Sequence, residues 1–145
     1  MSFSLDANIL LYASDETSSF HKQARHFLEE QSRGADLLCL AWPTIMAYQR
    51  IATHPGIFRR PLSPSDAWGN IRQLIAQPRV RVIGEQSGFP EDYERSTASF
   101  SVRGNHVPDA HLATILRQNG VGRIYSADAD FRKFDFLDVI NPFGR

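Results

Sequence analysis

Short apolar runs alternate with segments of helical periodicity along the whole chain. The short runs predict strands at 3–5, 37–40, 80–83, 123–126 and 137–140. Apolar residues that recur every three or four positions predict helices at 7–13, 42–54, 90–103 and 108–119, between Phe20 and Gly34, and between Ser63 and Gln77. Strands that alternate with helices in this way indicate βαβ units, a parallel sheet and right-handed crossovers, so the predicted fold class is α/β.

Nothing in the pattern divides the chain into separate units. The sequence has 145 residues and contains no internal repeat, low-complexity segment or linker. A chain of this length supports one domain built around one core. We therefore expect residues 1–145 to form a single domain.

Asp6 stands where the first predicted strand ends and the first helix begins. Ligands of open α/β sheets bind at the carboxyl ends of the strands, so a carboxylate at this turn is a candidate for a binding site. The alternative is that Asp6 only caps the helix that follows it, as aspartates often do.

Asp109 lies in the first turn of the helix predicted at 108–119. It precedes Leu112, Ala113 and Leu116 by three, four and seven residues, so it shares their apolar face and points toward the sheet. A favourable interaction with the helix dipole is the alternative explanation. That alternative accounts for the position of Asp109 along the helix but not for its inward direction.

Two more aspartates, Asp128 and Asp130, follow the strand predicted at 123–126. Residues of this segment also suit a helix cap, which is the structural alternative for both. If the sheet is parallel, three separate segments deliver Asp6, Asp109 and Asp128 to one of its edges.

Carboxylates gathered in this way repel one another. Two unit charges 4 Å apart cost about 4 kcal/mol at an effective dielectric constant near 20. Lys133 is the one lysine in these segments. A hard divalent ion such as Mg²⁺, which prefers oxygen ligands, is the natural counter-charge, and it would favour metal-assisted hydrolysis of a phosphodiester.

The charge balance limits how a nucleic acid could bind. Sixteen Lys and Arg residues match sixteen Asp and Glu residues, so the formal net charge is zero and a global basic field is excluded. The single cysteine, Cys39, allows no intrachain disulfide, which agrees with a reducing cytosol. With no basic-then-apolar leader and no long apolar span, we expect a soluble cytoplasmic protein with no membrane partner.

Four stretches in register carry a resemblance to a known family. They are LDANIL at 5–10, RIATHP at 50–55, VPDAHLA at 107–113 and SADADF at 126–131. The chain resembles a PIN domain, in particular the VapC-type toxins of bacterial toxin–antitoxin pairs. The resemblance implies a three-layer α/β/α sandwich with a central parallel sheet, and an endoribonuclease that depends on Mg²⁺ or Mn²⁺. It also implies an RNA substrate, a homodimer and inhibition by a cognate VapB-like antitoxin.

The resemblance also carries roles over to particular residues. By motif position the metal-coordinating acids are Asp6, Asp109 and Asp128, with Asp130 as their more variable companion. The residues that orient these carboxylates are Asn8 and Ser126.

The chain departs from the family pattern in one place. The family usually carries a glutamate on the helix after the second strand, and Ala47 stands at the matching position. Neither flanking residue, Tyr48 nor Gln49, replaces a carboxylate. This departure favours one metal ion over two. It also leaves open an alternative function, a catalytically weakened module that binds an antitoxin or RNA without cleavage.

Two other families that place an aspartate after the first strand fit poorly. A haloacid-dehalogenase-type phosphatase needs a second aspartate where this chain has Asn8, and a response-regulator receiver needs an acidic pair beside Asp6. Among the cations we favour Arg50, Arg59 and Arg60 for weak RNA binding, and give less weight to Arg103, Arg132 and Lys133. An ion pair with an active-site carboxylate is the alternative for Arg50.

We expect structural rather than functional roles for the histidines near Asp109 and for the two tryptophans. We expect no catalytic role for His106 or His111, and the helical spacing turns His111 away from Asp109. Trp42 and Trp68 are expected to lie in the core rather than to stack on bases.

Overall fold

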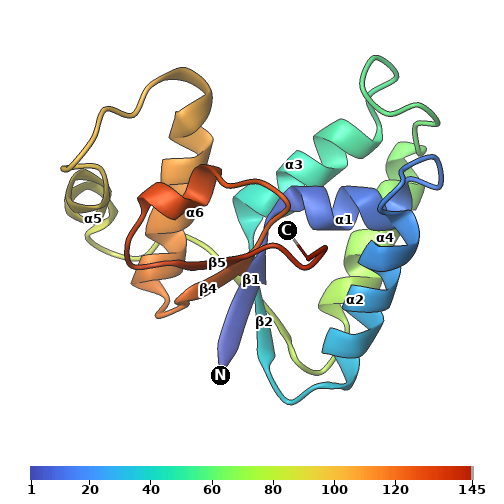
Figure 1. Cartoon of the computed structure of the whole chain (residues 1–145), viewed down its shortest axis with the longest axis horizontal. Coiled ribbons are helices and arrows are strands. Elements are labelled where there is room, and N and C mark those ends of the chain that lie inside the picture. Colours follow the sequence, from blue (N-terminus) through green and yellow to red (C-terminus); the bar gives the residue numbers. More distant parts are fainter. Residues whose placement is uncertain (145) are drawn as a thin grey trace.

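A five-stranded parallel sheet runs through the computed structural model, which describes residues 1–144 (Figure 1). Its strands stand in the order β3-β2-β1-β4-β5. Their bounds are β1 (Ser2–Leu5), β2 (Leu37–Ala41), β3 (Val80–Ile83), β4 (Arg123–Tyr125) and β5 (Asp138–Ile140). All five strands predicted from the apolar runs are present, and the α/β class is confirmed.

Helices cover both faces of this sheet. Helices α1, α2 and α4 lie on one side, and α5 and α6 lie on the other (Figure 1). The helices are α1 (Ala7–Ser14), α2 (His21–Arg33), α3 (Trp42–Ala52), α4 (Pro64–Ile75), α5 (Phe89–Ser96) and α6 (Val107–Gln118), with two 3-10 turns, η1 (Gly104–His106) and η2 (Asp130–Lys133). The three-layer arrangement is therefore confirmed. The helices of residues 1–144 are too short or too polar to cross a lipid bilayer.

Alternation along the strands builds two apolar cores, one under each helical layer. In β2, Leu38 and Leu40 belong to the core beneath α1, α2 and α4, whereas Cys39 and Ala41 belong to the core beneath α6. This is the period-2 pattern of a strand that is buried on both faces. The fully buried Ser4 satisfies its hydroxyl by donating to the Cys39 carbonyl at 2.6 Å.

The strand order reverses direction at the middle of the sheet. From β1 the chain moves outward through β2 to β3, and then returns to the other side of β1 with β4 and β5. Leu5 pairs with Tyr125, and the Asp6 amide donates to the Tyr125 carbonyl at 3.0 Å. The carboxyl ends of β1 and β4 are thus a topological switch point, where such sheets bind ligands.

The helix predicted at 90–103 is wrong in its second half. Helix α5 ends at Ser96, and the Thr97 hydroxyl donates back to the Tyr93 carbonyl at 2.9 Å. Hydroxyl side chains compete for backbone groups in this way and weaken a helix. Phe100 still packs inward, with its ring centroid 5.3 Å from that of Phe134. An apolar residue at this position therefore indicated a packed side chain correctly, but it did not indicate a helix.

The core prediction for Trp42 is also wrong. Trp42 is the first residue of α3, at the carboxyl edge of the sheet, and it is 46% exposed. Trp68 is half-buried and packs against the core, as expected.

Candidate metal centre

Asp6 occupies the N-cap position of α1 without capping it, because its side chain accepts no cap hydrogen bond. Its Oδ2 instead accepts from the Ser126 hydroxyl at 2.8 Å and from the Asn8 amide at 3.2 Å. Burial raises the pKa of Asp6, the Ser126 hydrogen bond opposes that rise, and the charges of Asp128 and Asp130 add to it. The capping alternative for Asp6 is therefore wrong. Its carboxylate joins the end of β1 to the end of β4.

Ser126 connects Asp6 to the loop that follows β4. Its side chain is almost completely buried, and its oxygen accepts from the Asp128 amide at 3.1 Å. Asp128 Oδ1 in turn accepts from the Asp130 amide at 2.9 Å, which shapes the turn into η2. The alternative of a structural role at the start of a helix therefore holds in part for Asp128, because one of its carboxylate oxygens stabilises the turn that leads into η2. Both aspartates remain exposed.

Asp109 points from the first turn of α6 toward the same place, with its side chain 21% exposed. Burial raises its pKa to about 6, together with the charge of Asp6 and then that of Asp130, while Lys133 acts in the opposite direction. The charge of Asp128 also contributes to this rise, so Asp109 lies within the field of the three other aspartates. The inward direction predicted from the apolar face is therefore observed.

The tightest group of possible metal ligands differs from the predicted one. Ligand atoms of His106, Asp109 and Asp130 lie within 4.8 Å of one another. In the described part of the chain, Asp6 and Asp128 do not join this group at that spacing. The four aspartates together, Asp6, Asp109, Asp128 and Asp130, are called the acidic edge below.

Sequence reasoning gave little weight to two residues that the structure brings to the acidic edge. His106 Nδ1 lies 4.0 Å from Asp109 Oδ2, and Lys133 Nζ lies 2.9 Å from the same nitrogen. The signal was present for His106, since it precedes Asp109 by three residues across the start of α6. His111 behaves as expected, for it pairs with Glu85 at 2.7 Å.

Helix α3 adds no carboxylate to the acidic edge. Its sequence contains no acidic residue, and Ala47 is half-buried on it. The neighbouring Tyr48 turns toward α1 and α4, where its hydroxyl meets Ser14 at 2.7 Å and Asn70 at 3.0 Å. The candidate ligands therefore come only from the ends of β1 and β4, from η2 and from the start of α6.

The three arginines favoured for RNA are not at the acidic edge. Arg50 is exposed on α3 and forms no ion pair within residues 1–144, so the proposed pairing with a carboxylate is absent there. Arg59 and Arg60 lie on the loop between α3 and α4, at the far upper right of Figure 1. Arg60 lines a different cavity.

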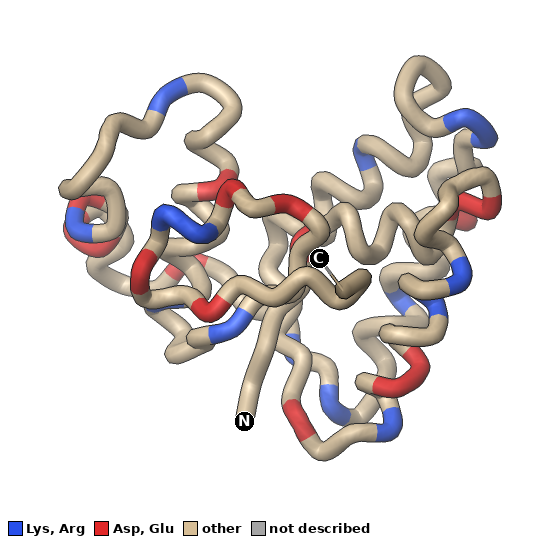
Figure 2. The backbone as a smooth tube through the Cα atoms, in the orientation of Figure 1, with Lys and Arg blue, Asp and Glu red and all other residues tan. Residues whose placement is uncertain are grey.

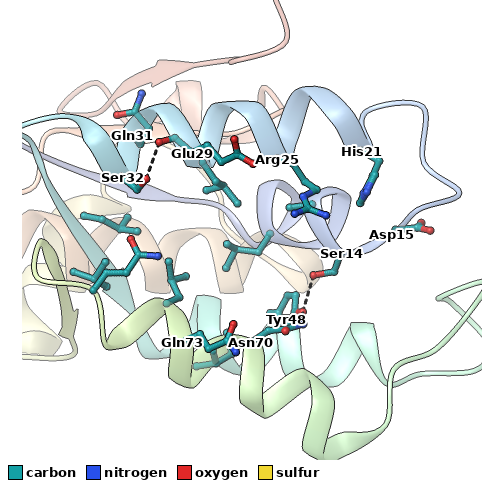
Figure 3. Close-up of a pocket in the computed structure, with 18 of the residues that line it drawn as sticks. Ser14, Asp15, His21, Arg25, Glu29, Gln31, Ser32, Tyr48, Asn70 and Gln73 are labelled. Carbon is teal, nitrogen blue, oxygen red and sulfur yellow. Dashed lines mark hydrogen bonds between the residues drawn. The ribbon is translucent and has the colours of Figure 1, made fainter.

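That cavity, which we call the apolar groove, has a volume of about 730 Å³. It runs between α2 and α4, and polar side chains such as Arg25, Glu29 and Gln73 project from the two helices (Figure 3). Its apolar lining comes from the sheet and three helices: Phe3, Leu10, Leu28, Leu38, Leu74 and Val80. No motif in the sequence indicated this groove.

The donor set of the acidic edge fits a hard divalent cation. Carboxylate oxygens are the ligands that Mg²⁺ prefers. Burial is the main cause of the raised pKa of Asp109, and the charges of Asp6 and Asp130 add to it, so a bound cation would relieve that repulsion. Asp109 and Asp130 lie close enough together to share one ion. Asp6, fixed by Ser126 and Asn8, stands beside them as a further ligand or as a charge that attracts the ion.

Similarity to known proteins extends over nearly the whole chain. The chain is 40% identical over 143 residues to Ribonuclease VapC48 of Mycobacterium tuberculosis, covering 99% of each protein. It is 33% identical over 131 residues to Ribonuclease VapC37 of the same species, covering 90% of each. No family model matches the chain.

Solved structures with the same fold agree with these relatives. A VapBC2 complex from Rickettsia felis bound to promoter DNA aligns with a TM-score of 0.68 and 14% identity, over 97% of this chain and 98% of the other. VapC20 of M. tuberculosis, a toxin that cleaves the sarcin-ricin loop, aligns with a TM-score of 0.66 and 14% identity over 90% and 93%. From the full-length identity and this shared architecture, the chain belongs to the VapC family of PIN-domain ribonucleases.

Proposed function

We propose that this protein is the metal-dependent endoribonuclease toxin of a toxin–antitoxin pair, and that it hydrolyses RNA phosphodiester bonds at the acidic edge. One observation carries the proposal. Carboxylates from distant segments gather at the switch point of the sheet: ligand atoms of Asp109 and Asp130 lie within 4.8 Å of each other, and burial together with the charges of Asp6 and Asp130 raises the pKa of Asp109. Relatives at 40% and 33% identity that are named ribonucleases support the same reaction.

The residues of the acidic edge take the following roles in this proposal. Asp6, Asp109, Asp128 and Asp130 together form the cation site, and Asp109 and Asp130 are the pair whose ligand atoms lie close enough to share the ion. Ser126 and Asn8 keep the Asp6 carboxylate oriented through the hydrogen bonds to its Oδ2. Such supporting residues commonly change metal affinity or activity about 10- to 100-fold when they are replaced.

Mg²⁺ is the ion that we propose, with Mn²⁺ as a substitute. Mg²⁺ is usually held by only one or two carboxylates, which suits a site without the glutamate that Ala47 replaces. When bound, such an ion stabilises negative charge on the phosphate and lowers the pKa of water at the site. We infer a single ion.

Incubation of the purified protein with total RNA tests the reaction. Cleavage is expected with Mg²⁺ or Mn²⁺ and not with EDTA, and mapping of the new RNA ends would give the sequence preference. The matched control is Asp6→Asn, which removes one charge but keeps the side-chain size. Metal-independent cleavage, or equal cleavage by both proteins, would reveal a contaminating nuclease and contradict the proposal.

The partner that we propose is a VapB-like antitoxin, which binds in the apolar groove. Several of the similar solved structures are VapBC complexes. The groove offers apolar side chains between two helices, and both signs of charge line it through Arg25 and Glu29 (Figure 3). Asp36 also belongs to its lining. A protein segment with an apolar face and a mixed-charge rim matches such a surface.

A homodimer completes the proposed assembly, with residues 1–145 of each copy forming a single PIN domain. Trp42 and Met46 are one helical turn apart on α3 and are 46% and 51% exposed. Exposed large apolar side chains at this spacing favour burial against another protein surface. The cytoplasm, where RNA is available and Cys39 stays reduced, is the proposed location.

A further inference from the structure

Two adjacent cations of η2 flank the acidic edge. This turn begins with Asp130 and ends with Arg132 and Lys133. Lys133 Nζ contacts His106 Nδ1 at 2.9 Å, and that nitrogen is 4.0 Å from Asp109 Oδ2. The ammonium group of Lys133 is therefore held on the Asp109 side of the site.

Arg132 lies on the other side, in a small pocket next to Asp128. The pocket has a volume of about 150 Å³ and is lined by the loop from Ser126 to Ala129, by Arg132 and by Asn141. A cavity of this volume has room for several waters and therefore for a phosphate group. Arg132 is exposed and forms no ion pair among residues 1–144, so its guanidinium is available to a ligand.

Charge explains why cations are needed at this place. The chain has no net charge, so its field as a whole does not attract a polyanion. An RNA strand that reaches the acidic edge meets carboxylates, and local cations must offset the repulsion. Figure 2 shows the basic segment of η2 directly beside the acidic segments, whereas the α3–α4 loop with Arg59 and Arg60 lies across the molecule.

We propose that Arg132 and Lys133 are the residues that position the RNA backbone at the acidic edge. Lys133 contacts the phosphate that is to be cleaved, and Arg132 binds a neighbouring phosphate in the small pocket. The side chains suit these tasks, because a guanidinium fork binds a phosphate with two hydrogen bonds and an ammonium acts as a point charge. This assignment rests on the proposed ribonuclease function.

The salt dependence of RNA binding tests the assignment. The probe is a fluorescently labelled single-stranded RNA oligonucleotide, followed by anisotropy in EDTA so that cleavage does not interfere. Each phosphate contact adds about 0.7 to the slope of log K against log salt for a single strand. The double variant Arg132→Gln/Lys133→Gln should therefore lower the slope by about 1.4.

The chain offers a matched control in its other basic pair. Arg59→Gln/Arg60→Gln removes the same two charges and should leave the slope unchanged. An equal loss of slope in both double variants, or a loss confined to the control, would overturn the assignment. Melting temperatures of all variants show whether either pair is needed for the fold.

Cleavage kinetics separate positioning from a purely structural role. Arg132→Gln should raise KM with little change in kcat, since it removes a contact made equally before and during reaction, whereas Lys133→Gln should lower kcat. Lys133→Arg should restore part of the rate because it restores the charge. Loss of rate in Lys133→Gln without such rescue, and with an unchanged salt slope, would contradict the proposal.

The two proposals can fail separately. If wild-type protein cleaves total RNA with Mg²⁺ while the Arg132 and Lys133 variants bind and cleave as it does, only the assignment of the two cations fails. If wild-type protein neither binds nor cleaves RNA, the ribonuclease proposal fails and the assignment fails with it.

Discussion

The acidic edge and the apolar groove are built by the same sheet in opposite ways. The acidic edge uses single residues at the ends of elements, such as Asp6 after β1 and Asp109 at the start of α6. The groove uses many ordinary apolar side chains from the sheet and three helices. The like charges concentrated at the acidic edge favour binding of a cation. The apolar side chains spread along the groove favour binding of a protein segment. In the proposed function, RNA is cleaved at the acidic edge and the antitoxin binds in the apolar groove, and each variant below tests that separation.

The largest expected effect is the loss of cleavage in Asp109→Ala. The substitution removes a carboxylate from the tightest ligand group, so the rate should fall by more than the factor of about 100 that replacement of a merely supporting residue costs. The rate is measured on total RNA with Mg²⁺. Antitoxin binding should stay unchanged, because Asp109 does not line the apolar groove.

Melting of Asp109→Ala in EDTA supplies the control. The variant should be at least as stable as the wild-type protein, since the substitution relieves repulsion among carboxylates. Near-normal cleavage by a folded Asp109→Ala protein would remove Asp109 from the site.

The next effect is weaker antitoxin binding in Leu74→Asp, on the α4 side of the groove. A charge placed in an apolar interface should cost at least about 2 kcal/mol, which corresponds to a roughly 30-fold rise in Kd. Titration calorimetry with the antitoxin measures this change, and RNA cleavage should remain at the wild-type rate.

Gln23→Asp is the matched control for Leu74→Asp. It introduces the same charge on the exposed face of α2, outside the groove, and should leave the Kd unchanged. Leu74→Asn, which carries no charge, shows whether any loss of binding comes from the charge or from lost packing. Normal binding by a folded Leu74→Asp protein would move the antitoxin to another surface.

The metal is also expected to stabilise the folded protein. At 100 times its Kd, a ligand that binds only the folded state adds about 2.7 kcal/mol, which should raise Tm by about 5–10 °C in a protein of this size. Differential scanning calorimetry with Mg²⁺ or Mn²⁺ measures the shift. Asp6→Asn should reduce it, and Leu74→Asp should not, because the groove holds no metal.

The contrast between the two surfaces also explains what could be predicted from the sequence. Strand ends are visible as short apolar runs, so the positions of Asp6 and Asp128 followed from chain order and parallel topology. His106 and Lys133 were named in the sequence but given little weight, because their proximity depends on how η1 and η2 approach each other. The pattern of apolar and polar residues around each turn does not indicate how far apart the two turns lie in the folded chain.

The apolar groove was invisible for a different reason. Leu28 and Leu74 have the spacing of residues on buried helix faces, and the periodicity that predicts a helix does not say whether its apolar face is fully covered. Arg60 illustrates the same difficulty, since its sequence neighbours gave no indication that it lines this groove. Only the spacing of α2 and α4 across the groove decides how much apolar surface remains open.

The smallest expected effect is a change of stability with pH in the metal-free protein. The ordinary pKa of Asp109 is 3.8 and its folded-state pKa is about 6, so between these values the folded chain keeps a proton that the unfolded chain releases. The contribution of Asp109 to the free energy of unfolding should therefore rise as pH falls from 7 toward 4. Asp6, whose pKa is also raised, acts in the same direction.

Urea denaturation in EDTA at pH 7 and pH 5, for wild-type protein and Asp109→Asn, isolates this contribution. Other titrating groups act similarly in both proteins and cancel in the difference. The wild-type protein should gain stability relative to the variant at pH 5. Saturating Mg²⁺ should reverse this trend, because the cation favours the ionised carboxylate and its binding weakens as protons compete for Asp109. A difference between the two proteins that is the same at both pH values would mean that Asp109 does not experience the crowded carboxylates that distinguish the acidic edge from the groove.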